Sequence, residues 1–259
     1  MMIRRTGYLP DPAGHRRTPF RALARRIGAT AFPPSASLFE AAPPVMDQGQ
    51  TGSCTGHATS TAIYIAGRLA WVPSPAEIYR NGRAIDRDDL TVALTDDGAQ
   101  PNQVFRAVNE FGVRAMIPLT DRFSDADIAT INDEPKLGDL EEESSPLMTT
   151  FVRDYGIFSL GAARLDDVCV ALAAGRPVAT AIAGGSDAFQ SYVGGVLPAL
   201  HAPLDHYVVL LGYETLANGH RVYHGRNSWS DQWGESGNFR IAQEAIAELS
   251  DLVVVEGGL

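Results

Sequence analysis

Residues 227–241 read NSWSDQWGESGNFRI, and this stretch decides the interpretation of the fold. Its residues 238–241 are a strand candidate, and Gly234 and Gly237 mark a turn before that strand. Further strand candidates lie at residues 178–182, 206–213, 221–224 and 252–255. A helix is expected at residues 165–174, ended by the Gly-Arg-Pro of residues 175–177. The second half of the chain is therefore predicted to be β-rich.

The first half of the chain is predicted to be helical. Apolar residues recur at helical spacing over residues 55–69, in a helix that starts near Cys54. Further helices are expected at residues 76–85, after Pro75, and at residues 102–110, closed by Gly112. An acidic segment, residues 121–145, separates the two halves. We expect an α+β protein with a helical half at residues 39–145, a β-rich half at residues 146–259 and a cleft between them.

The first 38 residues are predicted to form an extended basic arm. They contain five prolines and one short helix-capable stretch, residues 20–27. Their seven arginines and one aspartate give a formal charge of +6, which leaves about −16 for the rest of a chain whose total is −10. Such an arm suggests an intramolecular contact, a membrane-surface or targeting role, or a solvated tail. A docked arm would pair with acidic residues such as those in residues 121–143.

The composition excludes several classes of protein. With 45% hydrophobic residues the chain is globular rather than disordered, and its net charge of −10 argues against nucleic acid as a partner. No apolar run reaches the roughly 18 residues that a membrane span requires. Two cysteines cannot make a disulfide framework, and an apolar secretory signal is absent. We expect a cytoplasmic protein, or one exported without a cleaved apolar signal.

Cys54 is the first candidate for chemistry. It follows a loop with two glycines and heads an apolar helix, where the helix dipole lowers the pKa of a thiol. His206 stands at the entry to a predicted strand of the other half, and Asn227 follows the next strand candidate. A cysteine nucleophile needs an imidazole within hydrogen-bond reach and a third group that orients the ring. These three residues are predicted to meet across the cleft.

The other cysteine and histidines favour structural interpretations. Cys169 lies on an apolar helical stripe and is expected in the core. His57, one helical turn after Cys54, could tune the thiol but is better explained as a helix-packing residue. His201 is a loop residue or lines the cleft. Together with His206 it lacks ligands at the spacing of a zinc site, and no metal or cofactor is expected.

Four blocks in order resemble the papain-like cysteine peptidases over about residues 40–259. They are DQGQTGSC at residues 47–54, DGAQP at 97–101, LDH at 204–206 and the stretch at 227–241. The resemblance implies a cleft between a helical half and a barrel-like β half. It implies peptide-bond hydrolysis through a thioester, most simply by an endopeptidase, and a polypeptide as substrate.

The resemblance also assigns roles residue by residue. Cys54 takes the place of the nucleophile, His206 that of the acid–base and Asn227 that of its orienting group. Gln48 and the Cys54 backbone N–H would form the oxyanion hole, and Trp229 would shield the His–Asn hydrogen bond. The implied substrate-binding residues are Gly98, Ala99, Ala181, Asp205, Tyr207 and Trp229. Ala181 and Tyr207 would wall the pocket for the second residue before the scissile bond, with an apolar preference.

Three departures from the family pattern suggest a bacterial-type member. Thr55 replaces the tryptophan that usually follows the nucleophile, and the flanking disulfide is missing because its positions fall near Thr51 and Asp96. Only about 38 residues precede the matching region, in place of a long helical propeptide, so the arm could act as a short inhibitory pro-segment. Two alternatives stay open: an inactive peptide-binding protein of the same fold, and an acyl transferase or deconjugating enzyme with the same triad.

Overall fold

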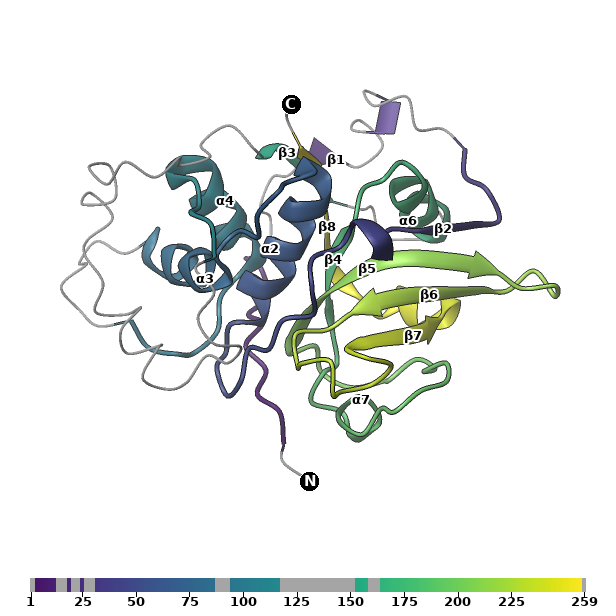
Figure 1. Ribbon diagram of the computed structural model, residues 1–259. Coiled ribbons are helices and arrows are strands. Elements are labelled where there is room, and N and C mark those ends of the chain that lie inside the picture. The colour runs from purple at the N-terminus through teal and green to yellow at the C-terminus, as the bar shows by residue number, and fades with distance from the viewer. Residues whose placement is uncertain are drawn as a thin grey trace.

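The computed structural model describes residues 3–12, 18–19, 24–25, 31–86, 94–116, 152–157 and 164–257. Three helices pack together on one side of the molecule, and most of the strands lie on the other (Figure 1). The helices are α2 (Cys54–Gly67), α3 (Pro75–Ala84) and α4 (Pro101–Phe111). Their bounds agree with the three predicted helices to within two residues, so the helical prediction for this half is confirmed.

Helix α2 is the central element of the helical half. It contacts both other helices and also strands β5 and β8 (below), so all but one of its residues are buried. The small residue Gly56 permits close packing, because a Cβ there would lie 2.3 Å from the Pro75 carbonyl oxygen at the start of α3. Ser74 caps α3 by accepting a 3.2 Å hydrogen bond from Glu77 N, and Gly112 caps α4 with a φ of 73°.

The strands form one sheet in the order β1-β3-β8-β4-β5-β6-β7, with β2 paired to β5. All pairs are antiparallel except β1–β3. The bounds are β1 Thr18–Pro19, β2 Ser35–Ser37, β3 Val152–Ile157, β4 Val178–Ile182, β5 His206–Thr215, β6 Arg221–Arg226, β7 Asn238–Ala242 and β8 Ser250–Gly257. The five strand candidates are confirmed as β4 to β8. Strands β1, β2 and β3 were not predicted, and β2 ties the end of the arm into the sheet.

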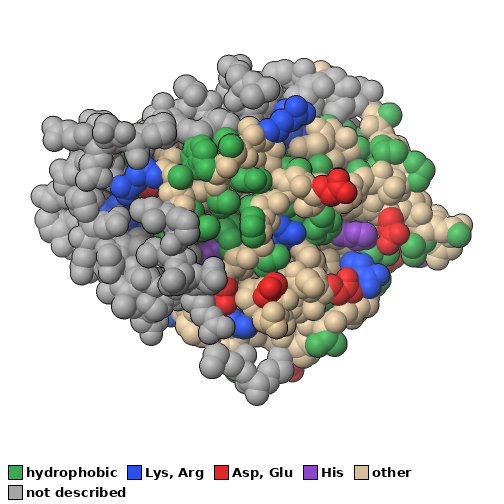
Figure 2. Space-filling view, viewed as in Figure 1, with side chains coloured by type: hydrophobic (Ala, Val, Ile, Leu, Met, Phe, Trp, Pro, Cys, Tyr) green, Lys and Arg blue, Asp and Glu red, His purple; other side chains and the backbone are tan. Residues whose placement is uncertain are grey.

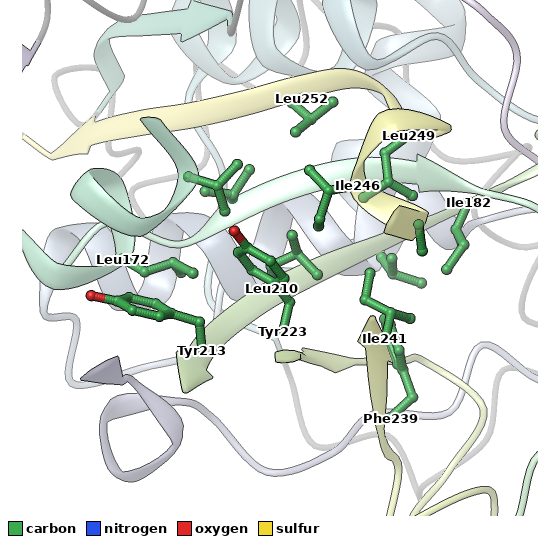
Figure 3. Packing of buried hydrophobic residues seen from close by; sticks show 14 of the residues in the cluster. Leu172, Ile182, Leu210, Tyr213, Tyr223, Phe239, Ile241, Ile246, Leu249 and Leu252 are labelled. Atoms are coloured by element: carbon green, nitrogen blue, oxygen red, sulfur yellow. The ribbon is translucent and has the colours of Figure 1, made fainter. Parts of the chain in front are cut away.

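Strand β5 is buried on both faces and divides the core in two. Val208 and Leu210 face a cluster under helix α6 (Arg164–Ala173), whereas Val209 and Leu211 face the cluster of α2, α3 and α4. Figure 3 shows the first cluster, where side chains from α6, β5, β6, β7 and β8 converge. A strand that is buried on both faces has a continuous run of apolar residues in its sequence. This run is why β5 could be predicted from the sequence.

Several predicted features lie outside the described residues. One is the acidic segment at residues 121–145, which was expected to contain the boundary between the two halves. The other is most of the helix-capable stretch at residues 20–27. Within the described ranges, no helix has the length and apolar character needed to cross a membrane. Acidic and basic side chains are interspersed on the face drawn in Figure 2. Ion pairs such as that of Arg240 and Glu235, whose side-chain atoms lie 2.6 Å apart, neutralise charge locally.

Candidate active site

Cys54 is the first residue of α2, and the loop before it is held from two sides. Gln48 N donates a 2.8 Å hydrogen bond to the Ser228 carbonyl in the β-rich half. Gly52 N donates to both carboxylate oxygens of Asp96, at 2.9 and 3.2 Å, and Asp96 also accepts from the Tyr79 hydroxyl at 2.6 Å. Asp96 therefore ties this loop to its neighbour at the place where the family resemblance implied a disulfide.

His206 and Asn227 are joined by a hydrogen bond. His206 begins β5, Asn227 directly follows β6, and a 2.7 Å hydrogen bond links His206 Nε2 to Asn227 Oδ1. Because an amide oxygen can only accept, Nε2 carries the proton. The Trp229 ring stacks on the His206 ring with centroids 4.6 Å apart. His206 Nδ1 is buried and has no hydrogen-bond partner among the described residues.

The Gln48 amide has a fixed orientation. Its Oε1 accepts a 2.6 Å hydrogen bond from the Ser228 hydroxyl, so its Nε2 points the other way. Nε2 donates to two carbonyl oxygens, that of Thr51 at 2.7 Å and that of Arg5 at 3.2 Å. Sequence reasoning missed Ser228, although its position directly after Asn227 was a usable signal.

The carbonyl of Arg5 belongs to the N-terminal arm, which passes between the two halves (Figure 1). On the helical side, Ala99 N donates to the Gly7 carbonyl at 2.9 Å and Leu9 N donates to the Ala99 carbonyl at 3.1 Å, in a parallel arrangement. On the β side, Gly7 N and Tyr8 N both donate to the Asp205 carbonyl, at 3.1 and 3.0 Å. Residues predicted to bind a substrate backbone thus hold the arm of the same chain.

Glycines allow this close approach of backbone to backbone. A Cβ on Gly7 would lie 1.9 Å from the Gly52 carbonyl oxygen, far inside van der Waals contact. On the facing loop, Gly98 has a φ of 96°, and a Cβ there would lie 2.2 Å from the Gly7 carbonyl oxygen. No larger residue at position 7 fits while the arm keeps this path.

Tyr8 is the arm's buried side chain in the cleft. It is 6% exposed and shares a contact cluster with Cys54, Ala58, Ala179, Ala181 and Tyr207. Its ring lies parallel to that of Tyr207, with centroids 5.8 Å apart. Ala181 and Tyr207, the two residues expected to wall one substrate pocket, thus pack in one cluster with the Tyr8 side chain.

The first two arginines of the arm make ion pairs with aspartates beside the active-site loop. Arg4 lies 3.5 Å from Asp47, and Arg5 lies 3.1 Å from Asp96. The Gln190 amide also brackets Arg4, accepting from its N at 2.9 Å and donating to its carbonyl at 3.2 Å. The expected acidic partners at residues 121–143 lie outside the described residues.

The filled cleft changes the electrostatics of the reactive groups. Burial raises the pKa of the Cys54 thiol to about 12, although hydrogen bonds from the backbone of Tyr207, Gly7 and Thr55 act to lower it. Burial lowers the pKa of His206 to about 4, against the opposing effect of its Asn227 hydrogen bond. The expectation that the helix dipole favours a thiolate is therefore wrong for this state, in which thiol and imidazole are both neutral.

The remaining candidates are structural. His57 is buried, its Nδ1 lies 2.9 Å from the Ser53 carbonyl oxygen, and burial lowers its pKa to about 4. Cys169 is buried 3.5 Å from the Tyr223 hydroxyl. His201 is exposed and pairs with Glu248. No group of three or more His, Cys, Asp or Glu side chains suited to a metal occurs in the described part of the chain.

Comparison with curated proteins finds plant relatives over short segments. The chain is 45% identical over 73 residues to the probable cysteine protease RD21B of Arabidopsis thaliana, which covers 28% of this chain and 16% of that protein. It is 44% identical over 70 residues to vignain of Ricinus communis, a match that covers 26% of this chain and 19% of that protein. The chain therefore matches less than a quarter of the length of these relatives.

Comparison with solved structures covers nearly the whole chain. Xylellain, a cysteine protease from Xylella fastidiosa, is 25% identical with a TM-score of 0.65, over 98% of this chain and 96% of that one. Digestive procathepsin L 3 of Tenebrio molitor is 19% identical with a TM-score of 0.68, and the match covers 99% of this chain and 77% of that one. This second likeness shows that the fold is shared. Residues 37–254 match the sequence profile of a protein family whose description is "Papain family cysteine protease". The chain belongs to the papain family of cysteine proteases.

Proposed function

We propose that this protein hydrolyses peptide bonds with Cys54 as nucleophile and that residues 3–12 inhibit it by filling the cleft. One observation carries the proposal. A peptide carbonyl, that of Arg5, already accepts from Gln48 Nε2 in a cleft where Ala99 and Asp205 bind the flanking backbone on both sides. Tyr8 follows Arg5 in the chain but lies against Ala181 and Tyr207, the residues expected to contact the second residue before the scissile bond, so the arm runs opposite to the expected substrate direction. Because the arm has residues on both sides of the Arg5 contact, cleavage within a chain is favoured over trimming of its ends.

The chemical step follows from the protonation of His206. With Nε2–H held by Asn227, Nδ1 is the atom that accepts the Cys54 thiol proton. The thiolate attacks the carbonyl carbon, and the oxyanion is stabilised by Gln48 Nε2 and Cys54 N–H, at about 2.7–4 kcal/mol per donor. The imidazolium then gives its proton to the leaving amine and a thioester forms. A water that loses its proton to His206 cleaves the thioester and regenerates the thiol.

Backbone pairing and the buried Tyr8 ring hold the arm more strongly than charge does. Arg4 and Arg5 keep 27% and 46% of their side-chain surface exposed, and such ion pairs contribute only about 0–1 kcal/mol each. Burying an aromatic side chain contributes about 1.5–3 kcal/mol. Added salt should therefore loosen the arm without releasing it.

Two other functions share the same residues. An inactive peptide-binding protein would hold peptides in this cleft without turnover, and Thr55 in place of a tryptophan leaves room for it. A transferase would pass the acyl group to an acceptor other than water, and a deconjugating enzyme would hydrolyse the bond between a peptide and an attached group in place of a bond within a peptide chain. Turnover of plain peptides in water separates hydrolysis from both.

Cys54→Ala should abolish peptide hydrolysis and labelling by an epoxide-type thiol inhibitor, because no other group replaces the sulfur. The matched control is Cys169→Ala, which removes the core thiol and should keep both activities. Hydrolysis of a peptide library is measured by mass spectrometry, with circular dichroism to verify folding. Turnover by the folded Cys54→Ala protein would contradict the proposed nucleophile.

His206→Ala should cost far more activity than Asn227→Ala. The base itself contributes about 10²–10⁴-fold, whereas its orienting group acts through the ring that remains. The measurement is kcat/KM for one peptide substrate with both variants. Equal losses in two folded proteins would mean that Asn227 is not merely a positioning residue.

Gly7→Val in the full chain should open the cleft, since its Cβ cannot approach the Gly52 carbonyl. Inhibitor labelling of Cys54 and peptide hydrolysis should both rise well above those of the parent chain. Ile3→Val, an exposed change in the same arm, is the control and should leave both unchanged. Identical rates for the parent and Gly7→Val at low and high salt would rule out inhibition by the arm.

Docking of the arm should stabilise the protein most between about pH 6.5 and 9. His206 has a lowered pKa in the filled site, so its contribution is complete above 6.5 and is lost as the pH falls toward 4. Cys54 has a raised pKa, so its contribution is complete below 9.0 and is lost as the pH rises toward 12. The Tm difference between the parent and Gly7→Val, measured at pH 7.5 and 5, should shrink at pH 5. A difference that does not change with pH would contradict this linkage.

A further inference from the structure

Tyr79 and Asp96 join the two loops that border the cleft on its helical side. Gly52 N donates to both carboxylate oxygens of Asp96, at 2.9 and 3.2 Å. The Tyr79 hydroxyl donates a 2.6 Å hydrogen bond to Asp96 Oδ1 and accepts a 3.0 Å hydrogen bond from Gly98 N. One chain of hydrogen bonds, the Tyr79–Asp96 link, therefore runs from the loop before the nucleophile to the loop at Gly98.

Both loops carry groups that the proposed reaction uses. Gly52 stands two residues before Cys54, whose backbone N–H is one of the two oxyanion donors. Gly98 directly precedes Ala99, which binds the arm's backbone through both its N–H and its carbonyl, at 2.9 and 3.1 Å. Such groups act only where they are held in place, and a displacement of about 1 Å can cost about 100-fold in rate. The link thus acts on two parts of the site at once.

The tyrosine at the centre of the link is held rigidly. Tyr79 is a buried residue of α3, and the Arg83 guanidinium, one helical turn further on, lies 3.9 Å from the centre of its ring. Arg83 also donates to the carbonyl of Thr95, which directly precedes Asp96. Burial raises the pKa of Tyr79, so its hydroxyl stays protonated and donates to the Asp96 carboxylate. Both partners of the bond are therefore fixed from the same helix.

We propose that Tyr79 and Asp96 are positioning residues, whose link sets the places of the Cys54 oxyanion donor and of the backbone-binding residue Ala99 together. This inference rests on the proposed peptidase function. The family resemblance implied a disulfide at this place, and the link reaches further than such a bond because it includes the Gly98 loop. A link that served stability alone would change Tm and leave kcat and KM as they are.

The test uses the full chain with Gly7→Val, because the arm's Arg5 also pairs with Asp96 and would otherwise affect the result. Tyr79→Phe removes the hydroxyl and leaves the ring in its contact with Arg83. For one peptide substrate, kcat should fall about tenfold because the oxyanion donor is displaced. KM should rise as well, because the loop at Gly98 loses its acceptor.

The matched control is Tyr223→Phe, which removes a buried hydroxyl that donates to the Leu165 carbonyl at 3.1 Å in the other core. It should lower Tm but leave kcat and KM unchanged. Asp96→Asn keeps an oxygen that can accept from Gly52 N, so it should retain more activity than Asp96→Ala. Tyr79→Phe combined with Asp96→Ala should cost less than the product of the single effects, because both break one chain of bonds. Effects that multiply would overturn the link.

A peptide aldehyde separates this inference from the proposed peptidase function. The Cys54 sulfur adds to the aldehyde carbon and the thiol proton passes to the aldehyde oxygen, so binding reports on the oxyanion donors without hydrolysis. The corresponding peptide alcohol, which forms no bond to sulfur, is the reference ligand. Tyr79→Phe should weaken binding of the aldehyde about tenfold more than binding of the alcohol.

The two possible failures give different results. This difference in binding, found in a Gly7→Val protein that does not turn over peptides, would sustain the link and overturn the peptidase function. Turnover by Gly7→Val, with kcat, KM and aldehyde affinity all unchanged by Tyr79→Phe, would overturn the link and leave the peptidase function intact.

Discussion

The double burial of β5 is the constraint on which the rest of the structure depends. Its alternate residues fill two separate cores, one under α6 and one under α2, so a shift of the strand by one residue would move each set into the core packed for the other. This fixed register places His206 at the strand's start and, through β6, places Asn227 within 2.7 Å of it. Because α2 packs on the same strand, Cys54 at the head of α2 is brought to the same end of the sheet. The candidate active site is therefore a consequence of how the sheet is covered.

The filled cleft explains why a helix start alone does not predict the state of Cys54. A helix dipole stabilises a nearby charge by about 0.3–1 kcal/mol. The rise of the thiol pKa from 9.0 to about 12 corresponds to an opposing effect on the order of 4 kcal/mol. Desolvation by the arm and the surrounding strands thus exceeds the dipole. The thiolate–imidazolium pair that the proposed mechanism requires would form in an open cleft, whereas burial in the closed cleft favours a neutral thiol and a neutral imidazole.

The sequence was enough to predict helices and strands that have a local pattern of residues. It was not enough to predict contacts between residues that are far apart in the chain. Helix α2 and strand β5 were predictable from periodicity and apolar runs, and the His206–Asn227 pair from the resemblance in the stretch at 227–241. The hydrogen bond of Tyr8 to Asp251 joins residues 243 positions apart, and neither is unusual in its local sequence. A bulge in β8 that turns Asp251 toward the cleft arises from pairing with β4, which no local pattern encodes. Ser228 was missed for a different reason, since its hydroxyl matters only once the Gln48 loop lies beside it.

The contacts of the arm describe what a substrate would meet. Ala99 binds the arm through backbone atoms, and Asp205 binds it through its backbone carbonyl and through a 3.5 Å hydrogen bond that its carboxylate accepts from the Thr6 hydroxyl. The backbone contacts would accept most sequences. The position of Gly7 has no room for a side chain, because backbone atoms of Gly52 and Gly98 lie close to it on two sides. Tyr8 is different, since its ring and hydroxyl each meet a matching group, the Tyr207 ring and the Asp251 carboxylate. Among these arm residues, Tyr8 is the one whose ring and hydroxyl both have a matching partner, so under the proposed function a substrate would have to displace an occupant that already fits the cleft.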